Sequence, residues 1–133
     1  MSDSTPHQLK IRVYAEDTDL QGVVYHANYL RFYERGRTEY FRERNMLLSD
    51  SIAKGILYVL RQSNIYYCYP AKLDDHLTVE TTIVKAKRCS VKFHQQIRNQ
   101  EQKVVSRAEI EVVCIDDNAK PQRLPQAVCD YCT

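Results

Sequence analysis

A carboxylate on a short loop directly before a helical pattern is the feature of this sequence best suited to chemistry. Asp19 lies in the loop 17–24, and the aromatic segment 25–30 follows at once. The N-terminus of a helix offers free backbone N–H groups, which stabilise negative charge developing on a carbonyl oxygen. A carboxylate aimed at that point could act as a nucleophile or as a general base. The same carboxylate could instead cap the helix or the turn.

The elements on either side of this loop follow from the hydrophobic pattern. Residues 9–15 alternate between apolar and polar side chains, which predicts a half-buried strand before the loop. Gly22 can adopt a positive φ, so the loop can turn there. From Tyr25 to Leu48 the spacing becomes helical, and we expect one helix of about five or more turns. Its buried face consists of Tyr29, Tyr33, Gly36, Tyr40 and Leu47.

The rest of the chain is dominated by strand patterns. Residues 56–69 are apolar and rich in tyrosine, and alternating runs cover 77–84, 91–98 and 107–114. A polar turn at 99–102 links the last two runs as a hairpin. Four strands after one strand and one long helix predict an α+β chain, in which a mostly antiparallel sheet wraps the helix.

Length and composition limit the classes of protein that fit. A chain of 133 residues without repeats or linkers predicts a single domain over 1–133, with a less certain tail over 117–133. The net charge of +2 does not indicate a nucleic-acid partner. No apolar run approaches the ~20 residues of a transmembrane helix, and the N-terminus lacks an apolar signal segment. We therefore expect a cytoplasmic protein.

The cysteines predict neither a disulfide framework nor a metal site. Five of them are scattered along the chain, which is typical of reduced thiols in the cytosol. Cys129 and Cys132 form a Cys-x-x-Cys pair, but no second pair accompanies them. We interpret this pair as an incidental feature of the tail, and we expect no metal ligands in the chain.

The motif around the loop resembles a family signature. Residues 12–30, continuing through 33–37, are similar to the signature of hotdog-fold acyl-CoA thioesterases of the 4-hydroxybenzoyl-CoA type. The similarity is greatest to the YbgC-type branch, which is associated with the Tol-Pal system, and it includes residues 69–75. The resemblance implies a hotdog fold, in which a five-stranded antiparallel sheet wraps around one long central helix. It also implies a homodimer or homotetramer with the active site between subunits.

The resemblance assigns roles to residues of the loop and of the helix start. Asp19 matches the catalytic carboxylate, which either attacks the thioester carbonyl to form an anhydride or activates a water molecule. His26 matches the position where a main-chain N–H polarises the thioester carbonyl, and its imidazole could also contribute. Tyr25 would line the acyl pocket, and Asn28 could cap the helix. Ala15 departs from the family pattern, because related sequences often carry tyrosine there.

Further residues are expected to hold the coenzyme A portion of the substrate. The resemblance places Lys87, Arg88 and Ser90 near the CoA nucleotide, whose phosphates attract cations. The alternative is that these basic residues form an ordinary solvated surface. Arg61 and Ser63 are weaker candidates for contacts across a subunit interface. No cofactor is expected, because a thioester is already an activated acyl group.

A charged pair on the expected helix could support the site. Glu34 and Arg37 stand three residues apart, close enough for an ion pair. Arg37 falls within the apolar face, where a cation is unusual. The pair could be a partly buried structural contact, an interface contact or a support of the catalytic residues.

The activity predicted from these residues is hydrolysis of an acyl-CoA thioester to a free acid and CoA. One alternative is a binding module for acyl-CoA or acyl carrier protein, linked to the Tol-Pal system or to phospholipid synthesis, with weak hydrolysis. Another is a hotdog dehydratase, which needs a histidine and an acid placed to remove water from a hydroxyacyl group, and the loop motif fits it less well. The sequence does not determine the length of the acyl chain.

Overall fold

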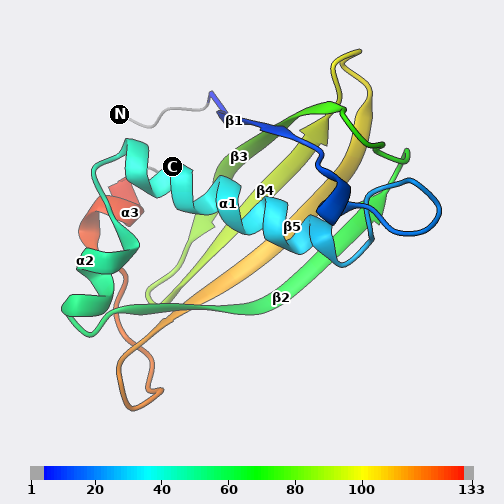
Figure 1. Ribbon diagram of the computed structural model, residues 1–133. Helices are drawn as coiled ribbons and strands as arrows, with labels where there is room; N and C mark the ends of the chain where they lie inside the picture. The colour runs from blue at the N-terminus through cyan, green and yellow to red at the C-terminus, as the bar shows by residue number, and fades with distance from the viewer. Residues whose placement is uncertain (1–4, 131–133) are drawn as a thin grey trace.

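Five antiparallel strands form one sheet that curves around helix α1 (Figure 1). The computed structural model describes residues 5–130. The strands are β1 (His7–Arg12), β2 (Leu57–Tyr67), β3 (His76–Ala86), β4 (Ser90–Arg98) and β5 (Val104–Ile115). Their order across the sheet is β1-β3-β4-β5-β2, and every neighbouring pair is antiparallel. The predicted α+β class and the five-stranded antiparallel sheet are confirmed.

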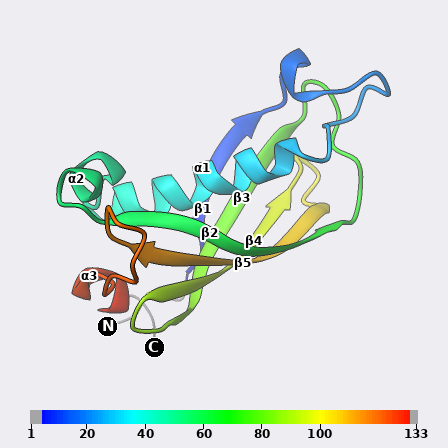
Figure 2. The ribbon, with the colours of Figure 1, turned by 90° about the horizontal axis from the view of Figure 1, so that it is seen from below.

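The helical elements lie mainly on one face and at the ends of this sheet. They are the 3-10 turn η1 (Ala15–Asp17), α1 (Asn28–Glu43), α2 (Leu48–Ala53) and α3 (Gln126–Asp130). Helix α1 crosses the sheet nearest to β1 and β3, and Figure 2 shows α2 beside the start of β2. Among the helices of residues 5–130, none is long and apolar enough to cross a bilayer.

Gly36 sets the closest approach of α1 to the sheet. A Cβ atom at Gly36 would lie 2.7 Å from Val79 Cγ1, 2.9 Å from Thr81 Oγ1 and 3.0 Å from Gln95 Nε2. All three neighbours are fully buried, so none can move aside without disturbing the packed interior. A side chain at this position would therefore hold the helix away from the sheet.

Aromatic residues fill the interior on both sides of Gly36. The predicted helix face is confirmed for Tyr29, Tyr33, Gly36 and Tyr40, which are all buried. It is wrong for Leu47, which lies beyond the end of α1 and is half-buried. Tyr33 donates its hydroxyl proton to Ser106 Oγ at 2.6 Å, and burial raises the pKa of this phenol well above its usual range. The sequence pattern missed Phe32, which is fully buried as well.

A buried amide beneath the helix joins α1 to the middle of the sheet. Gln95 of β4 donates from its amide nitrogen to the Tyr33 carbonyl at 2.9 Å and to Thr81 Oγ1 at 2.8 Å. Its amide oxygen accepts a hydrogen bond from Arg37 Nη1 at 3.0 Å. Both ends of the amide thus have partners, which offsets the cost of burying a polar group.

The predicted single helix over 25–48 is wrong at both ends. Helix α1 spans Asn28–Glu43, about four turns. Beyond its end, Asn45 adopts a φ of 62°, and the N–H of Met46 donates to the Phe41 carbonyl at 2.9 Å. This is a Schellman motif, in which asparagine takes the left-handed position that glycine usually occupies. The chain then continues into the separate helix α2.

The first strand also ends earlier than its alternating pattern predicts. Strand β1 stops at Arg12, whereas the alternation continues to Ala15. The Asp17 carboxylate accepts a hydrogen bond from the N–H of Tyr14 at 2.8 Å, and the chain turns into η1 there. Ala15 therefore lies in a 3-10 turn rather than on the strand that the alternation predicts.

The segment after Asp116, which the sequence specified least, packs against the core over the described residues. The N–H of Leu124 donates to the carbonyl of Arg88 at 2.9 Å. Leu124 is 4% exposed and Val128 is fully buried, so this segment closes one end of the core. Within the described chain the cysteines Cys68, Cys89, Cys114 and Cys129 are free thiols. Cys132 lies outside the described residues, and the interpretation of the Cys-x-x-Cys pair stays a prediction.

We expect Gly36→Ala to lower the free energy of unfolding by about 1–2 kcal/mol. Overpacking a buried site costs about 1–3 kcal/mol, and a Cβ only 2.7 Å from Val79 Cγ1 puts this site at about 2–3 kcal/mol. The better helix propensity of alanine offsets about 1 kcal/mol of that cost. Chemical denaturation followed by circular dichroism measures the change. Arg31→Ala, on the exposed side of the same helix, is the matched control and should change stability by less than about 0.5 kcal/mol. Equal stabilities of Gly36→Ala and the wild type would contradict the close approach.

Candidate active site

Asp19 lines a cleft at the N-terminal end of α1. The cleft has a volume of about 340 Å³. Its walls come from the loop before α1, the start of α1 and the end of β2, which Figure 1 shows together at one end of the molecule. The lining residues are Asp19, Gln21, Val23, Val24, His26, Tyr29, Tyr67, Cys68, Tyr69 and Pro70. The structure thus brings Asp19 and His26, the two expected catalytic residues, to one site.

A tight turn holds the Asp19 side chain in this cleft. The N–H of Asp19 donates to the Val23 carbonyl at 3.0 Å, and one Asp19 carboxylate oxygen accepts the N–H of Gln21 at 2.8 Å. Gly22 has a φ of 80°, a left-handed conformation that glycine adopts without strain. The second carboxylate oxygen accepts no hydrogen bond from residues 5–130, so it is free to meet a substrate or a water molecule.

The other aspartate of the motif, Asp17, is buried and fully hydrogen-bonded. It is 8% exposed, and its two carboxylate oxygens accept the Tyr14 N–H at 2.8 Å and Asn28 Nδ2 at 2.9 Å. Asp17 therefore ties the end of β1 to the first residue of α1. The expectation that Asn28 caps the helix is wrong, because its side chain reaches across the loop to Asp17 and the capping position is Ala27.

The start of α1 presents backbone donors that have no acceptor. In the described part of the chain, the N–H groups of His26 and Ala27 donate no hydrogen bond. The Tyr67 hydroxyl donates to the His26 carbonyl at 3.1 Å, and the Tyr67 ring packs edge-on against Tyr29 with centroids 5.3 Å apart. Strand β2 thus holds the peptide group that joins His26 to Ala27. Free N–H groups at a helix start favour negative charge beside them.

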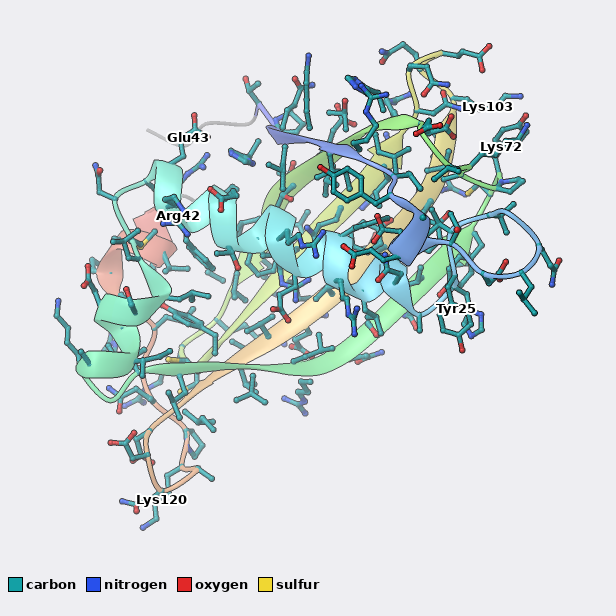
Figure 3. The ribbon with its side chains drawn as sticks, viewed as in Figure 1. Tyr25, Arg42, Glu43, Lys72, Lys103 and Lys120 are labelled. Atoms are coloured by element: carbon teal, nitrogen blue, oxygen red, sulfur yellow. The ribbon has the colours of Figure 1, made fainter. Side chains whose placement is uncertain are left out.

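Tyr25 does not line the Asp19 cleft of its own chain. Its ring packs against the His26 ring with centroids 4.4 Å apart. It borders a separate hollow of about 200 Å³ that Glu16 and Arg31 also line. Figure 3 shows Tyr25 at the surface beside the loop. Within one chain, the expected contact of Tyr25 with an acyl pocket at Asp19 is therefore not formed.

The expected CoA-binding residues lie at the opposite end of the sheet from Asp19. Lys87 and Arg88 are exposed in the turn between β3 and β4, and Ser90 is buried at the start of β4. The cleft borders the residues that precede β3, and the 11 residues of that strand span about 30 Å. Figure 3 marks the two ends, with Tyr25 near the cleft and Lys120 at the far end. One chain alone does not bring these residues to Asp19.

Arg61 and Ser63 lie on β2, which is an edge strand paired with β5 alone. Arg61 is exposed and its Nε lies 4.0 Å from a Glu111 carboxylate oxygen. Ser63 is half-buried. Neither residue lines the Asp19 cleft of its own chain.

Glu34 and Arg37 are also absent from the Asp19 cleft, and they do not form the expected ion pair. The Arg37 side chain turns inward to Gln95, whereas Glu34 stays exposed. Both residues line a second cavity between α1, α2 and β2.

Sequence reasoning missed three cleft residues at the end of β2, namely Tyr67, Cys68 and Tyr69. They are about forty positions from the loop, and tertiary folding brings them to it. The sequence feature that could have indicated them is the tyrosine-rich run before Pro70, next to the segment 69–75 that resembles the family. This run contains no residue type that points to catalysis. The sequence also contained no sign that Asp17 is structural. Asp17 and Asp19 look alike in the motif, and only their different burial in the fold distinguishes their roles.

Comparison with known proteins identifies the family. The profile described as thioesterase-like superfamily matches residues 13–130. The chain belongs to the thioesterase-like superfamily. It is 40% identical over 127 residues to the acyl-CoA thioester hydrolase YbgC of Escherichia coli O6:H1, with 95% of each chain covered. It is 42% identical over 120 residues to the acyl-CoA thioesterase YbgC of Haemophilus influenzae, with 89% of this chain and 88% of the relative covered.

A solved thioesterase structure with a similar backbone supports the assigned fold. The 1,4-dihydroxy-2-naphthoyl-CoA thioesterase of Synechocystis matches with a TM-score of 0.86 and 28% sequence identity. The match covers 94% of this chain and 96% of that structure. The hotdog arrangement expected from the sequence is confirmed.

We expect Asp17→Ala to lower the free energy of unfolding by about 1–3 kcal/mol, because it leaves the buried Asn28 amide and the part-buried Tyr14 N–H without their acceptor. Asp19→Ala is the matched control in the same motif. It loses one hydrogen bond at a half-exposed site and should cost less than about 1 kcal/mol. Urea denaturation of both variants measures the contrast, and a larger loss for Asp19→Ala would contradict these roles.

Proposed function

We propose that this protein is an acyl-CoA thioesterase that hydrolyses an acyl-CoA thioester to a free acid and CoA. The observation that carries the proposal is the free carboxylate oxygen of Asp19 in a cleft beside unpaired N–H groups at the start of α1. The names of the Escherichia coli and Haemophilus influenzae relatives support this activity. A thioester is already activated, so the proposed reaction needs no cofactor.

Two routes are compatible with this arrangement. In the first, the Asp19 carboxylate attacks the thioester carbonyl carbon, and the CoA thiolate leaves from the tetrahedral intermediate. Water then hydrolyses the resulting mixed anhydride, which releases the acid and restores Asp19. In the second, Asp19 takes a proton from a water molecule whose oxygen attacks the carbonyl, and the departing thiolate receives a proton.

The start of α1 serves both routes as the oxyanion site. Negative charge develops on the thioester oxygen in the transition state, and the N–H groups of His26 and Ala27 would stabilise it. The imidazole of His26 lines the same cleft and could add a further donor. Tyr67 would act as a positioning residue, since its hydroxyl holds the His26 carbonyl and with it the adjoining peptide.

We propose that two copies pair through β2 and share the active sites. Strand β2 has 11 residues, no lysine, and exposed apolar side chains at Val59, Leu60, Tyr66 and Tyr67. The other edge strand, β1, has six residues and carries Lys10, a residue that discourages edge pairing. If Lys87 and Arg88 bind the CoA nucleotide, the roughly 30 Å of strand between them and Asp19 favours their coming from a partner subunit. Assembly into a homotetramer, a cytoplasmic location and a Tol-Pal partner stay predictions.

We expect Asp19→Asn to lower kcat/KM on acyl-CoA substrates by at least about 100-fold, since it removes the nucleophile or base. Release of free CoA thiol from a panel of short, long and aromatic acyl-CoA esters measures the activity. Asp117→Asn, an exposed aspartate in the turn after β5, is the matched control and should keep full activity. A folded Asp19→Asn variant with full activity would refute the assignment. Tight acyl-CoA binding by the wild type with feeble turnover of every ester would favour the binding module.

We expect Val59→Lys to shift the protein from dimer toward monomer, because a lysine on the exposed edge disfavours pairing with a second strand. Sedimentation equilibrium measures the molecular mass in solution. Leu73→Lys replaces a similarly exposed apolar residue outside the sheet and should leave the mass unchanged. A monomeric wild type, or a dimer that survives Val59→Lys undiminished, would contradict pairing through β2.

A further inference from the structure

Two cysteines face each other at the end of the sheet that carries the turn between β3 and β4. The ladder of β4 and β5 pairs Ser90 with Val113. One position further, Cys89 stands opposite Cys114, and the N–H of Cys114 donates to the Cys89 carbonyl at 2.8 Å. Both side chains are free thiols in the structure. The backbone thus holds two reduced cysteines in direct cross-strand register.

A directly opposed pair has nearly the spacing of a disulfide. Hydrogen-bonded partners in an antiparallel ladder have Cα atoms about 5.5 Å apart, and disulfides span about 4.4–6.8 Å between Cα atoms. The side chains of opposed residues leave the same face of the sheet, with Cβ atoms about 4.5–5.5 Å apart. A disulfide needs about 3.5–4.5 Å between these atoms, so its closure draws the two chains together by about 1 Å. Cys89 lies in the turn just before β4, where such a shift disturbs less of the ladder than it would in mid-sheet.

The two thiols differ in exposure, and this difference sets the order in which they react. Cys114 is fully buried, and burial, with a smaller contribution from the Cys89 thiol, raises the pKa of Cys114 to about 11. Cys114 therefore stays protonated at neutral pH. The electrostatic effect of Cys89 on Cys114 agrees with the two sulfur atoms being neighbours. Cys89 is half-buried, so an oxidant in the solvent reaches it first.

The remaining described cysteines lie elsewhere in the fold. Cys68 follows β2 in the Asp19 cleft, at the opposite end of the sheet from Cys114. Cys129 lies on α3, which Figure 2 shows at the same end of the molecule as the turn between β3 and β4. Neither has a cysteine opposite it in the strand ladders of the described chain. Cys129 is therefore a suitable control for the cross-strand pair.

We propose that Cys89 and Cys114 form a reversible oxidation site, at which hydrogen peroxide closes a disulfide between the turn before β4 and strand β5. The Cys89 thiolate attacks one peroxide oxygen, the O–O bond breaks, and the departing hydroxide takes up a proton to become water. The Cys114 sulfur then attacks the Cys89 sulfenic acid, and the second oxygen leaves as water with the Cys114 proton. Two thiols lose two electrons in total, and one peroxide becomes two water molecules. An added thiol reverses the bond by exchange.

The disulfide would alter the turn to which the proposed function assigns the CoA nucleotide. Cys89 lies between Arg88 and Ser90, and the N–H of Lys87 donates to the Ser90 carbonyl at 2.8 Å, so residues 87–90 form one tight turn. Joining Cys89 to β5 moves this turn and the cations on it. This consequence rests on the proposed function, whereas the disulfide itself does not. We expect a higher KM for acyl-CoA with little change in kcat, because Asp19 lies at the other end of the sheet.

Peptide mapping of the full chain tests the site directly. The protein is treated with a small excess of hydrogen peroxide, its remaining thiols are blocked, and it is digested without reductant. We expect a pair of peptides joined through Cys89 and Cys114, which dithiothreitol separates. Cys89→Ser should abolish this pair, and the matched variant Cys129→Ser should retain it. A map without the link, or with Cys89 joined to another cysteine in its place, would overturn the proposal.

Steady-state kinetics test the consequence for the turn. Peroxide should raise the KM of the wild type for acetyl-CoA at least about threefold and leave kcat within about twofold, while Cys89→Ser keeps its KM. Because Cys68 is exposed in the Asp19 cleft, the treated Cys89→Ser variant also controls for oxidation there. An unchanged KM in cross-linked protein would contradict the effect on the turn. The peptide map requires no activity, so a protein without hydrolysis would refute the proposed function and still decide whether the disulfide forms.

Discussion

The arrangement of this molecule depends on the close approach of α1 to the sheet at Gly36. Three buried atoms of β3 and β4 occupy the space where a Cβ would be. Because the helix lies so near the strands, Gln95 can reach the Tyr33 carbonyl from the sheet below. The same contact sets where the helix begins relative to the end of β2. The cleft that holds Asp19 is therefore a consequence of packing some two turns further along the helix.

The two aspartates of the loop motif have different roles, one structural and one chemical, and a single carboxylate could not fill both. Asp17 has both oxygens occupied and is nearly enclosed, so it holds the loop to the helix. Asp19 is half-exposed and keeps one oxygen free, which is the requirement for a nucleophile or a base. Two backbone hydrogen bonds close the five-residue turn from Asp19 to Val23, and this turn places Asp19 in the wall of the cleft.

The position of α1 over the sheet leaves space on one side. The helix lies closest to β1 and β3, at the far side of the sheet from β2. Two tyrosines of β2 reach α1. Tyr67 packs on Tyr29 and bonds the His26 carbonyl at the cleft, and Tyr58 stacks on Phe41 at the second cavity. One asymmetry of packing thus accounts for the Asp19 cleft, for the cavity at Arg37 and for an edge strand open to a second copy.

The sequence by itself determined the features that depend on neighbours along the chain. Period-two alternation located β3 and β4, helical spacing placed Tyr29, Tyr33, Gly36 and Tyr40 on one face, and the loop motif pointed to Asp19. The sequence pattern predicted two element ends wrongly, because a local hydrogen bond or turn ended the element earlier. The Asp17 carboxylate turns the chain after β1, and Asn45 ends α1.

Only the tertiary structure decided what depends on contacts between distant residues. It turned Arg37 toward Gln95 and away from Glu34, and it brought Tyr67 to the His26 carbonyl across 41 positions of the chain. It also buried one aspartate of the motif and left the other half-exposed. Burial and the choice of hydrogen-bond partner are set by the packing of sheet on helix, and no pattern of neighbouring residues encodes them.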